Sequence, residues 1–150
     1  MAYKRPESVL VVICEQETGC VLMLQRRDDP AFWQSVTGSL EPGETPRDAA
    51  LREVKEETGI DILAEGLRLT DCQRTVRYTI FPHFRHRYAP DVTHNTEHWF
   101  VLCLPAPRAV PLTEHLASEW LPAADAAGKT ISPSNGEAIE EFVRQCDFPQ

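Results

Sequence analysis

The sequence predicts a mixed α/β fold, in which a β-sheet is sandwiched between helices on its two faces. Residues 8–13 and 98–104 are runs dominated by apolar side chains, which is typical of strands buried on both faces. Residues 46–58 and 135–144 instead repeat apolar side chains at helical spacing. Because the chain has 150 residues and no repeat or linker-like segment, residues 1–150 are expected to form a single domain.

The first part of the chain is expected to form strands. A polar turn follows residues 8–13, and residues 21–24 supply a second apolar run, so a β-hairpin is expected. Residues 36–40 read as a brief strand that carries Gly38. Pro42 and Gly43 fit the two central positions of a type II turn, which would lead the chain into the first helix.

The helix predicted at residues 46–58 has clear start and stop signals. Thr45 is a good N-cap, Pro46 suits the first helical position, and Gly59 offers a left-handed end. One side of this helix is apolar and is expected to pack on the core; it consists of Ala50, Leu51, Val54 and Thr58.

Further strands and a terminal helix are expected in the second half of the chain. Residues 75–81 alternate between apolar and polar side chains, and residues 84–88 repeat this alternation after Pro82. Ser134 is expected to cap the helix at residues 135–144. The remaining expected segments are an interrupted strand at residues 62–69, a polar loop at 91–96, and strands at 98–104 and 119–121.

Composition and charge argue against several classes of binding partner and of structural site. The net charge is −8 and the pI about 5.1, which argues against nucleic-acid binding, because such proteins usually present a basic face. No apolar run approaches the ~20 residues of a membrane span, and the N-terminus lacks a signal-peptide core. The five cysteines are scattered and lack a CxxC pair, which argues against a disulfide framework or a zinc site. We therefore expect a cytoplasmic protein without a nucleic-acid or membrane partner; the oligomeric state is left open.

Three glutamates crowd the end of the first predicted helix. Glu53, Glu56 and Glu57 lie within one turn, where like charges repel by roughly 0.2–0.5 kcal/mol per pair and the helix dipole also disfavours them. One interpretation is a solvated acidic face. The other is a cation-binding face, because clustered carboxylate oxygens suit a hard ion such as Mg²⁺.

The flanking residues decide between these interpretations. They follow the pattern glycine, five residues, glutamate, seven residues, Arg-Glu-aliphatic, one residue, Glu-Glu, one residue, Gly-aliphatic. This pattern is the Nudix box, and the chain strongly resembles the Nudix hydrolases. The resemblance implies the Nudix fold, an α/β/α sandwich. The matching positions are Gly38, Glu44, Arg52, Glu53, Val54, Glu56, Glu57, Gly59 and Ile60.

The resemblance also implies a metal site. Nudix enzymes use Mg²⁺, with Mn²⁺ as a possible substitute, and the carbonyl of the box glycine, here Gly38, is often a ligand. By the same resemblance, Glu53 and Glu57 should hold the ion, Glu56 should assist, and Glu114 is a further candidate ligand.

The remaining catalytic roles follow from the same resemblance. One of the box glutamates, or Glu114, would orient or deprotonate the attacking water, with Glu97 and Glu119 as alternatives to Glu114. Arg52 and Glu44 are expected to fix the orientation of the metal-binding carboxylates, because a guanidinium can hold carboxylates in place.

Segments beyond the box, namely residues 3–13, 21–44, 72–90, 95–100 and 114–121, resemble the dihydroneopterin triphosphate pyrophosphohydrolases of bacterial folate synthesis, and the match runs over most of residues 3–142. Asp91 and the segment at 132–142 depart from that pattern. The resemblance implies hydrolysis of dihydroneopterin triphosphate to the monophosphate and pyrophosphate. The basic and aromatic segment at 72–90 suits a face that stacks one heterocycle and holds its phosphates. The candidate substrate contacts are Lys4, Arg26, Thr37, Tyr78, Thr79, Ile80, Phe81 and Ser132.

Two other functions stay open at this point. A pterin resembles guanine in shape and hydrogen-bonding edge, so the main substrate could instead be a nucleotide, such as dATP or an oxidised guanine nucleotide. The second alternative is a Nudix-fold ligand sensor without hydrolysis. Sensors usually lose box glutamates, whereas this chain retains them all.

Overall fold

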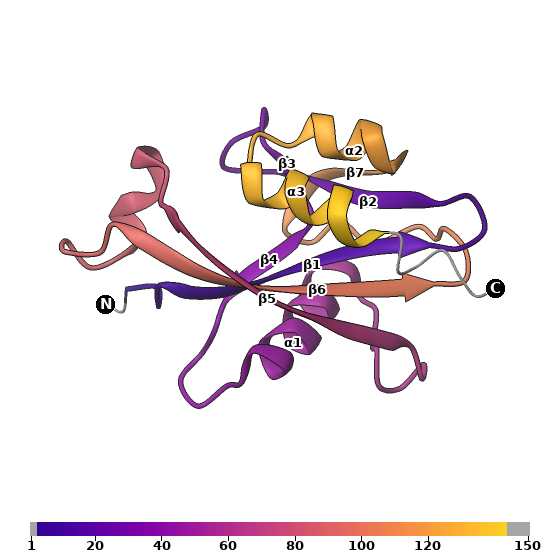
Figure 1. The fold of residues 1–150 in the computed structure, drawn as a ribbon, viewed down its shortest axis with the longest axis horizontal. Helices are drawn as coiled ribbons and strands as arrows, with labels where there is room; N and C mark the ends of the chain where they lie inside the picture. The colour runs from indigo at the N-terminus through magenta and orange to yellow at the C-terminus, as the bar shows by residue number, and fades with distance from the viewer. Residues whose placement is uncertain (1–2, 144–150) are drawn as a thin grey trace.

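The computed structural model describes residues 3–143, which form one mixed sheet covered by helices on both faces (Figure 1). The strands in this part of the chain are β1 (Glu7–Glu15), β2 (Cys20–Arg26), β3 (Trp33–Gln34), β4 (Val36–Ser39), β5 (Arg68–Thr79), β6 (His94–Leu104) and β7 (His115–Pro122). The helices are α1 (Pro46–Thr58), α2 (Ala123–Lys129) and α3 (Pro133–Phe142), together with a 3-10 helix, η1 (Pro82–Arg87).

The predicted sandwich of helices around a mixed sheet is confirmed. The strand order is β3-β2-β1-β6-β5, with β4 paired to β1 and β7 paired to β2. The β1 and β6 strands run parallel, while β1 is antiparallel to β2 and β4. Helix α1 covers one face of the sheet, and α2 and α3 cover the other (Figure 1). None of the helices within residues 3–143 has the length and apolar character needed to cross a membrane.

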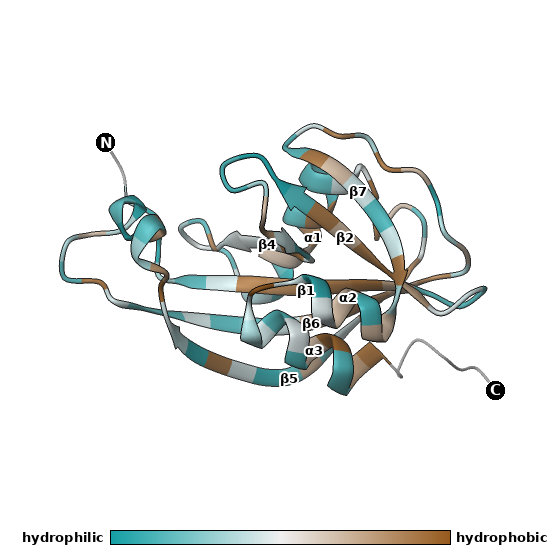
Figure 2. Ribbon diagram, turned by 90° about the horizontal axis from the view of Figure 1, so that it is seen from above, coloured by the Kyte–Doolittle hydropathy of each residue, from teal (hydrophilic) through white to brown (hydrophobic). Residues whose placement is uncertain are grey.

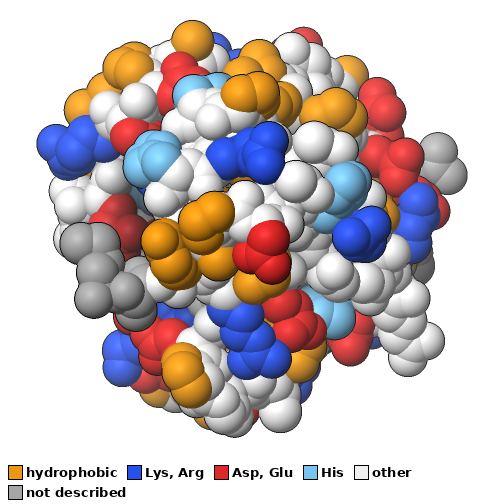
Figure 3. All heavy atoms as spheres, turned by 90° about the vertical axis from the view of Figure 1, so that its left-hand side faces the viewer, with side chains coloured by type: hydrophobic (Ala, Val, Ile, Leu, Met, Phe, Trp, Pro, Cys, Tyr) orange, Lys and Arg blue, Asp and Glu red, His pale blue; other side chains and the backbone are white. Residues whose placement is uncertain are grey.

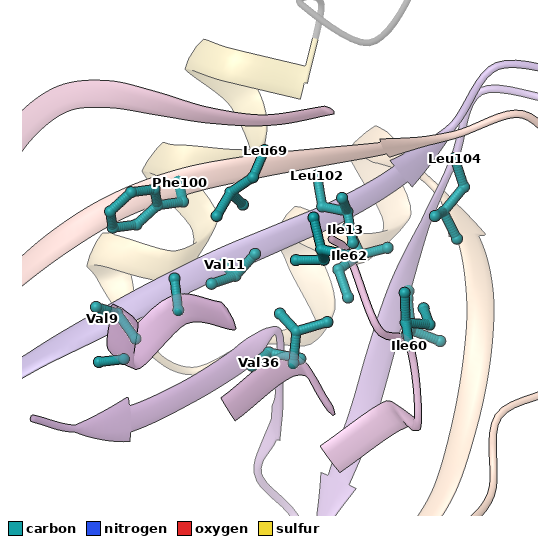
Figure 4. Packing of buried hydrophobic residues seen from close by; sticks show 14 of the residues in the cluster. Val9, Val11, Ile13, Val36, Ile60, Ile62, Leu69, Phe100, Leu102 and Leu104 are labelled. Atoms are coloured by element: carbon teal, nitrogen blue, oxygen red, sulfur yellow. The ribbon is translucent and has the colours of Figure 1, made fainter. Parts of the chain in front are cut away.

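Strand β1 is buried on both faces, as its continuous apolar run predicts. Val9, Val11 and Ile13 pack with the apolar side of α1 (Figure 4). The alternate residues, among them Leu10 and Val12, pack toward α2 and α3. Hydrophobic residues accordingly occupy long stretches of β1 and β2 in Figure 2, whereas the connecting loops are of mixed character.

The β1–β2 hairpin opens toward the N-terminal end of β1. The two strands pair where Cys14 lies opposite Val21, whereas residues Ser8 to Val11 pair with β4. Strand β2 continues instead beside β3 and β7. The sheet therefore divides at this end into two groups of strands, and the cavity described below lies here.

Helix α1 begins and ends as predicted. The Thr45 hydroxyl accepts a hydrogen bond from the Asp48 backbone N–H at 3.1 Å, and the Asp48 carboxylate accepts one from the Thr45 N–H. At the other end, Gly59 has φ 78°, and its N–H donates to the Lys55 carbonyl. Local sequence signals alone thus set the limits of this helix.

One predicted strand is wrong and another is only partly right. Of the strand predicted at residues 62–69, residues 62–66 form turns, because the Asp61 carboxylate accepts the Ala64 N–H at 3.0 Å and bends the chain, and only residues 68–69 belong to β5. Residues 84–88 fall in and after η1, in which the rings of His83 and Phe84 lie 4.1 Å apart between centroids. The alternating side chains of this segment therefore belong to a 3-10 helix whose aromatic rings pack on one another, and not to a strand.

Other boundaries also differ from prediction. Strand β6 begins at His94, so residues 94–96 are strand rather than loop, and β7 begins at His115. Helix α3 begins at Pro133, because the Ser132 hydroxyl, rather than that of Ser134, accepts the Asn135 N–H. The predicted end near residue 144 lies outside the described residues. The short β3 strand and helix α2 were not predicted.

Candidate active site

Helix α1 places Arg52 at the centre of the predicted glutamate cluster. Its guanidinium donates two hydrogen bonds to the Glu44 carboxylate, at 2.7 and 2.9 Å. It also donates to Glu53 at 3.0 Å, to Glu56 at 3.1 Å and to the Ser39 carbonyl at 3.0 Å. These bonds, that to Glu44 first, raise the pKa of Arg52. Because charge-assisted bidentate bonds fix both partners, Arg52 orients carboxylates from the helix and from the preceding loop.

Gly38 lies directly against the Glu53 carboxylate. It pairs with Val9 on β1, so its position is fixed by the sheet. A Cβ atom built on Gly38 would lie 1.9 Å from Glu53 Oε2 and 2.1 Å from its Cδ. The absence of a side chain at this position is therefore what lets the Glu53 carboxylate lie beside the β4 backbone.

Glu53 and Glu57 lie one helical turn apart and are both buried, with 9% and 3% of their surfaces exposed. Their carboxyl groups adjoin one another, and Glu57 Oε1 has no hydrogen-bond partner in residues 3–143. Burial, and then the Glu53 charge, raise the pKa of Glu57 well above its usual range. Burial likewise raises the pKa of Glu53. Although Arg52 bonds to Glu53, this buried pair is short of positive charge, and a bound cation would favour the ionised form of both groups.

The start of β7 lies beside this pair. His115 Nε2 is 3.6 Å from Glu57 Oε1, but burial lowers the pKa of His115, so the imidazole is poorly suited to neutralise the carboxylate. The preceding residue, Glu114, is exposed. After burial and Glu53, its charge also contributes to the raised pKa of Glu57. The segment therefore adds negative charge to the site.

The donor set fits a hard divalent cation. Within the described part of the chain, Glu57 Oε1 is a buried acceptor without a hydrogen-bond partner, and the Glu53 carboxylate lies beside the Gly38 backbone. Oxygen ligands of this kind suit Mg²⁺ or Mn²⁺. Within residues 3–143, no group of three or more acidic, His or Cys side chains is already arranged as a metal cluster, and Glu56 is exposed and bonded to Arg52. The ligand set of Glu53, Glu56, Glu57 and Glu114 with the Gly38 carbonyl therefore stays a prediction.

A cavity of about 630 Å³ lies at the divided end of the sheet and extends to Glu57 and Glu114. Its size is that of a pocket for a small organic molecule. Its lining includes residues from the first half of β1, the last residue of β2, strand β4, the end of β5, η1 and the start of α3. All the predicted substrate contacts line it, namely Lys4, Arg26, Thr37, Tyr78, Thr79, Ile80, Phe81 and Ser132.

One wall of the cavity is basic and aromatic. The Arg26 guanidinium lies 4.4 Å from the centroid of the Phe84 ring and donates two hydrogen bonds of 2.7 Å to Asp28. Arg87 also donates to Asp28. These hydrogen bonds, that from Arg26 first, lower the pKa of Asp28, which keeps this carboxylate charged and both guanidinium groups in place. Figure 3 shows basic and hydrophobic side chains beside one another on the face that carries η1.

The NUDIX domain model matches residues 4–142. The chain belongs to the Nudix family. It is 65% identical over 141 residues to the dihydroneopterin triphosphate diphosphatase of Escherichia coli (strain K12), covering 94% of each chain. It is 49% identical over 144 residues to the protein of the same name from Haemophilus influenzae, covering 95% of this chain and 90% of that one.

Solved Nudix structures share the fold. The structure of the E. coli dihydroneopterin triphosphate pyrophosphohydrolase superposes with a TM-score of 0.94 at 63% identity, covering 97% of this chain and 99% of that one. A C. elegans Ap4A hydrolase superposes with a TM-score of 0.74 at 26% identity, covering 93% of this chain and 96% of that one. Nudix hydrolases generally use divalent metal ions, which agrees with the oxygen-rich site at α1.

The Nudix cavity also contains polar residues that were not predicted as substrate contacts. Asn95 and Glu97 on β6 and Asn135 on α3 are buried and line it. No clear signal for them was present in the sequence, because the residues on either side of Asn95 and Glu97 are polar as well, and Asn135 lies on a helix. His115 and Phe84 also line the cavity, but only the folded chain brings them there.

We expect Arg52→Lys to lower kcat/KM by about 10- to 100-fold with a modest change in folding stability. A lysine ammonium cannot reproduce the forked bonds to Glu44 together with those to Glu53 and Glu56. Steady-state kinetics over a range of Mg²⁺ concentrations measures the effect. Arg108→Lys, in an exposed ion pair with Glu65 away from the cavity, is the control. Equal kinetics for both variants would contradict a positioning role for Arg52.

Proposed function

We propose that this Nudix protein hydrolyses dihydroneopterin triphosphate to dihydroneopterin monophosphate and pyrophosphate, a reaction of folate biosynthesis. The observation that carries the proposal is the 65% identity, over 94% of both chains, to a dihydroneopterin triphosphate diphosphatase. The cavity supports it, because it combines a basic and aromatic wall with an acidic end in a volume suited to one small triphosphate.

The acidic end would hold Mg²⁺, or Mn²⁺ in its place, through Glu53, Glu57 and the Gly38 carbonyl, with Glu56 assisting. When bound, the ion would neutralise charge on the non-bridging phosphate oxygens. Arg52, itself held by Glu44, keeps the Glu53 carboxylate oriented beside the β4 backbone. One of the box glutamates or Glu114 would orient or deprotonate the water that attacks phosphorus. The phosphorus–oxygen bond to pyrophosphate then breaks.

The basic wall would bind the phosphates and the aromatic groups the ring. Arg26 and Lys4 both line the cavity, and Asp28 fixes the Arg26 guanidinium in position. Phe81 and Tyr78 lie farther along the wall and offer surfaces for a flat heterocycle. Thr37, Thr79, Ile80 and Ser132 complete the proposed substrate contacts.

The proposal extends to the setting of the enzyme. Its partner would be the small-molecule triphosphate, and we place it in the cytoplasm, where folate precursors are made. Residues 1–150 would form a single Nudix domain, since the family model spans residues 4–142 of the chain. Retention of every box glutamate favours hydrolysis over a ligand-sensing role.

Release of pyrophosphate from a substrate panel tests the proposal. Purified protein with Mg²⁺ is given dihydroneopterin triphosphate, dATP, dGTP or 8-oxo-dGTP at equal low concentration. We expect the highest kcat/KM for the pterin and loss of turnover in EDTA that excess Mg²⁺ restores. A higher kcat/KM for a nucleotide would assign the protein as a nucleotide pyrophosphohydrolase, and no turnover of any compound would favour the sensor function.

A further inference from the structure

Glu97 and Asn95 present buried acceptor groups to the cavity and have no part in the chemistry derived above. They are 3% and 1% exposed, and both line the cavity. A spacing of two on β6 directs both side chains to the same face of the sheet. Ser8 of β1 and Val76 of β5 flank Glu97 in register, so this carboxyl is held in the middle of the sheet rather than at a loop.

The side-chain hydrogen bonds of Asn95 use its amide nitrogen and leave its amide oxygen without a partner in the described part of the chain. Its Nδ2 donates to Ser8 Oγ at 2.7 Å and to the Tyr78 hydroxyl at 3.1 Å, which engages both amide hydrogens. Its Oδ1 has no hydrogen-bond partner among residues 3–143. A buried acceptor without a partner is unfavourable, so a donor supplied by a ligand would stabilise the complex.

The surroundings of Glu97 are also short of positive charge. Trp99 Nε1 donates to Glu97 Oε1 at 3.0 Å, and the Ser134 side chain is its second hydrogen-bonding neighbour. Both partners are uncharged, and burial raises the pKa of Glu97. The carboxyl therefore gains most from a ligand that brings N–H donors to it.

We propose that Glu97, with Asn95 beside it, recognises the amino and ring N–H donors of a 2-amino-4-oxopyrimidine edge. A pterin and a guanine both carry this edge, and its two parallel N–H groups match the two oxygens of a carboxylate. Adenine instead presents an acceptor nitrogen at the corresponding ring position, which would face the carboxylate oxygen without a hydrogen between them. Glu97 is thus a specificity residue that selects the ring of the substrate, whereas the acidic end of the cavity binds the metal ion.

The choice of a pterin rests on the proposed function, but the ring recognition is testable with nucleotides alone. The pair dGTP and dITP differs only in the 2-amino group, so wild-type protein should show a kcat/KM about tenfold or more higher for dGTP. Equal values for the two would overturn the proposal. This comparison needs no variant, and it stands even if dihydroneopterin triphosphate proves a poor substrate, an outcome that would overturn only the proposed function.

Glu97→Gln then tests the residue itself. The substitution keeps the shape and the acceptor for Trp99 but replaces an acceptor oxygen by a donor. We expect the ratio of kcat/KM for dGTP to that for dITP to fall to within about threefold of unity, and the preference for dGTP and the pterin over dATP to fall at least about tenfold. The thermal midpoint verifies folding, and Glu65→Gln, an exposed carboxylate paired with Arg108, should leave every ratio unchanged. A uniform loss for all substrates, or unchanged ratios, would show that Glu97 is structural.

Discussion

Glu57→Gln is expected to lower kcat/KM by about 1,000-fold while the protein keeps its fold. The reason is that Glu57 contributes a buried carboxylate, one oxygen of which lacks a hydrogen-bond partner among residues 3–143 and is well placed to bind a divalent cation. Loss of such an electrostatic contact removes several kcal/mol of transition-state stabilisation, and about 4 kcal/mol corresponds to this factor. Turnover should be measured from sub-millimolar to high Mg²⁺. Near wild-type turnover at sub-millimolar Mg²⁺ would exclude Glu57 as a ligand.

The same substitution is expected to stabilise the metal-free protein at neutral pH. The pKa of Glu57 is raised in the folded state, so the native protein binds a proton more tightly than the unfolded chain does. The stability of wild type therefore falls as the pH rises above the usual glutamate range, and the variant lacks this loss. Thermal unfolding in EDTA should show a higher midpoint for the variant at pH 8 and little difference at pH 4. Glu140→Gln, an exposed glutamate of α3, is the control and should show neither effect.

Gly38→Ala is expected to lower kcat/KM by about 100-fold or more, with a smaller effect on folding. The added methyl group would occupy the position of the Glu53 carboxylate, 1.9 Å from its Oε2. The clashing atoms are the end of a flexible side chain, so the carboxylate can rotate away and spare the backbone. Its displacement would break the bond to Arg52 and remove one oxygen from the metal site.

Gly128→Ala provides the matched control for this substitution. A Cβ at Gly128 meets no atom within 4 Å, and in helix α2 alanine is favoured over glycine by roughly 0.5–1 kcal/mol. We expect unchanged kinetics and a slightly higher thermal midpoint. If Gly38→Ala behaved in the same way, the close approach of Glu53 to β4 would have no catalytic importance.

Local signals in the sequence sufficed for some elements. The cap at Thr45 and the left-handed Gly59 each act through backbone groups a few residues away, so the limits of α1 follow from the sequence. Tertiary contacts decide others. Helix α2 is short, contains Gly128 and has no side-chain cap, and it depends on the burial of Ala126 against the sheet.

The site shows the same division. The box glutamates share one helix, so their proximity is visible in the spacing alone. Glu97 and Asn135 lie on different elements far apart in sequence, and only the sheet register and the packing of α3 bring them to one cavity. The contacts of Phe84 likewise depend on η1, whose side-chain alternation was mistaken for that of a strand.

Because one guanidinium bonds to Glu44, Glu53 and Glu56, these positions cannot change independently of one another. Once Arg52 is lost, a further change at Glu44 removes a contact that no longer exists, so the effects of such pairs should fall well short of their sums. A neutral evolutionary route away from this arrangement would therefore have to pass through several impaired intermediates. The hydrogen bonds of Arg52 thus act as an epistatic constraint, under which Arg52, Glu44, Glu53 and Glu56 are expected to be retained or lost together during evolution.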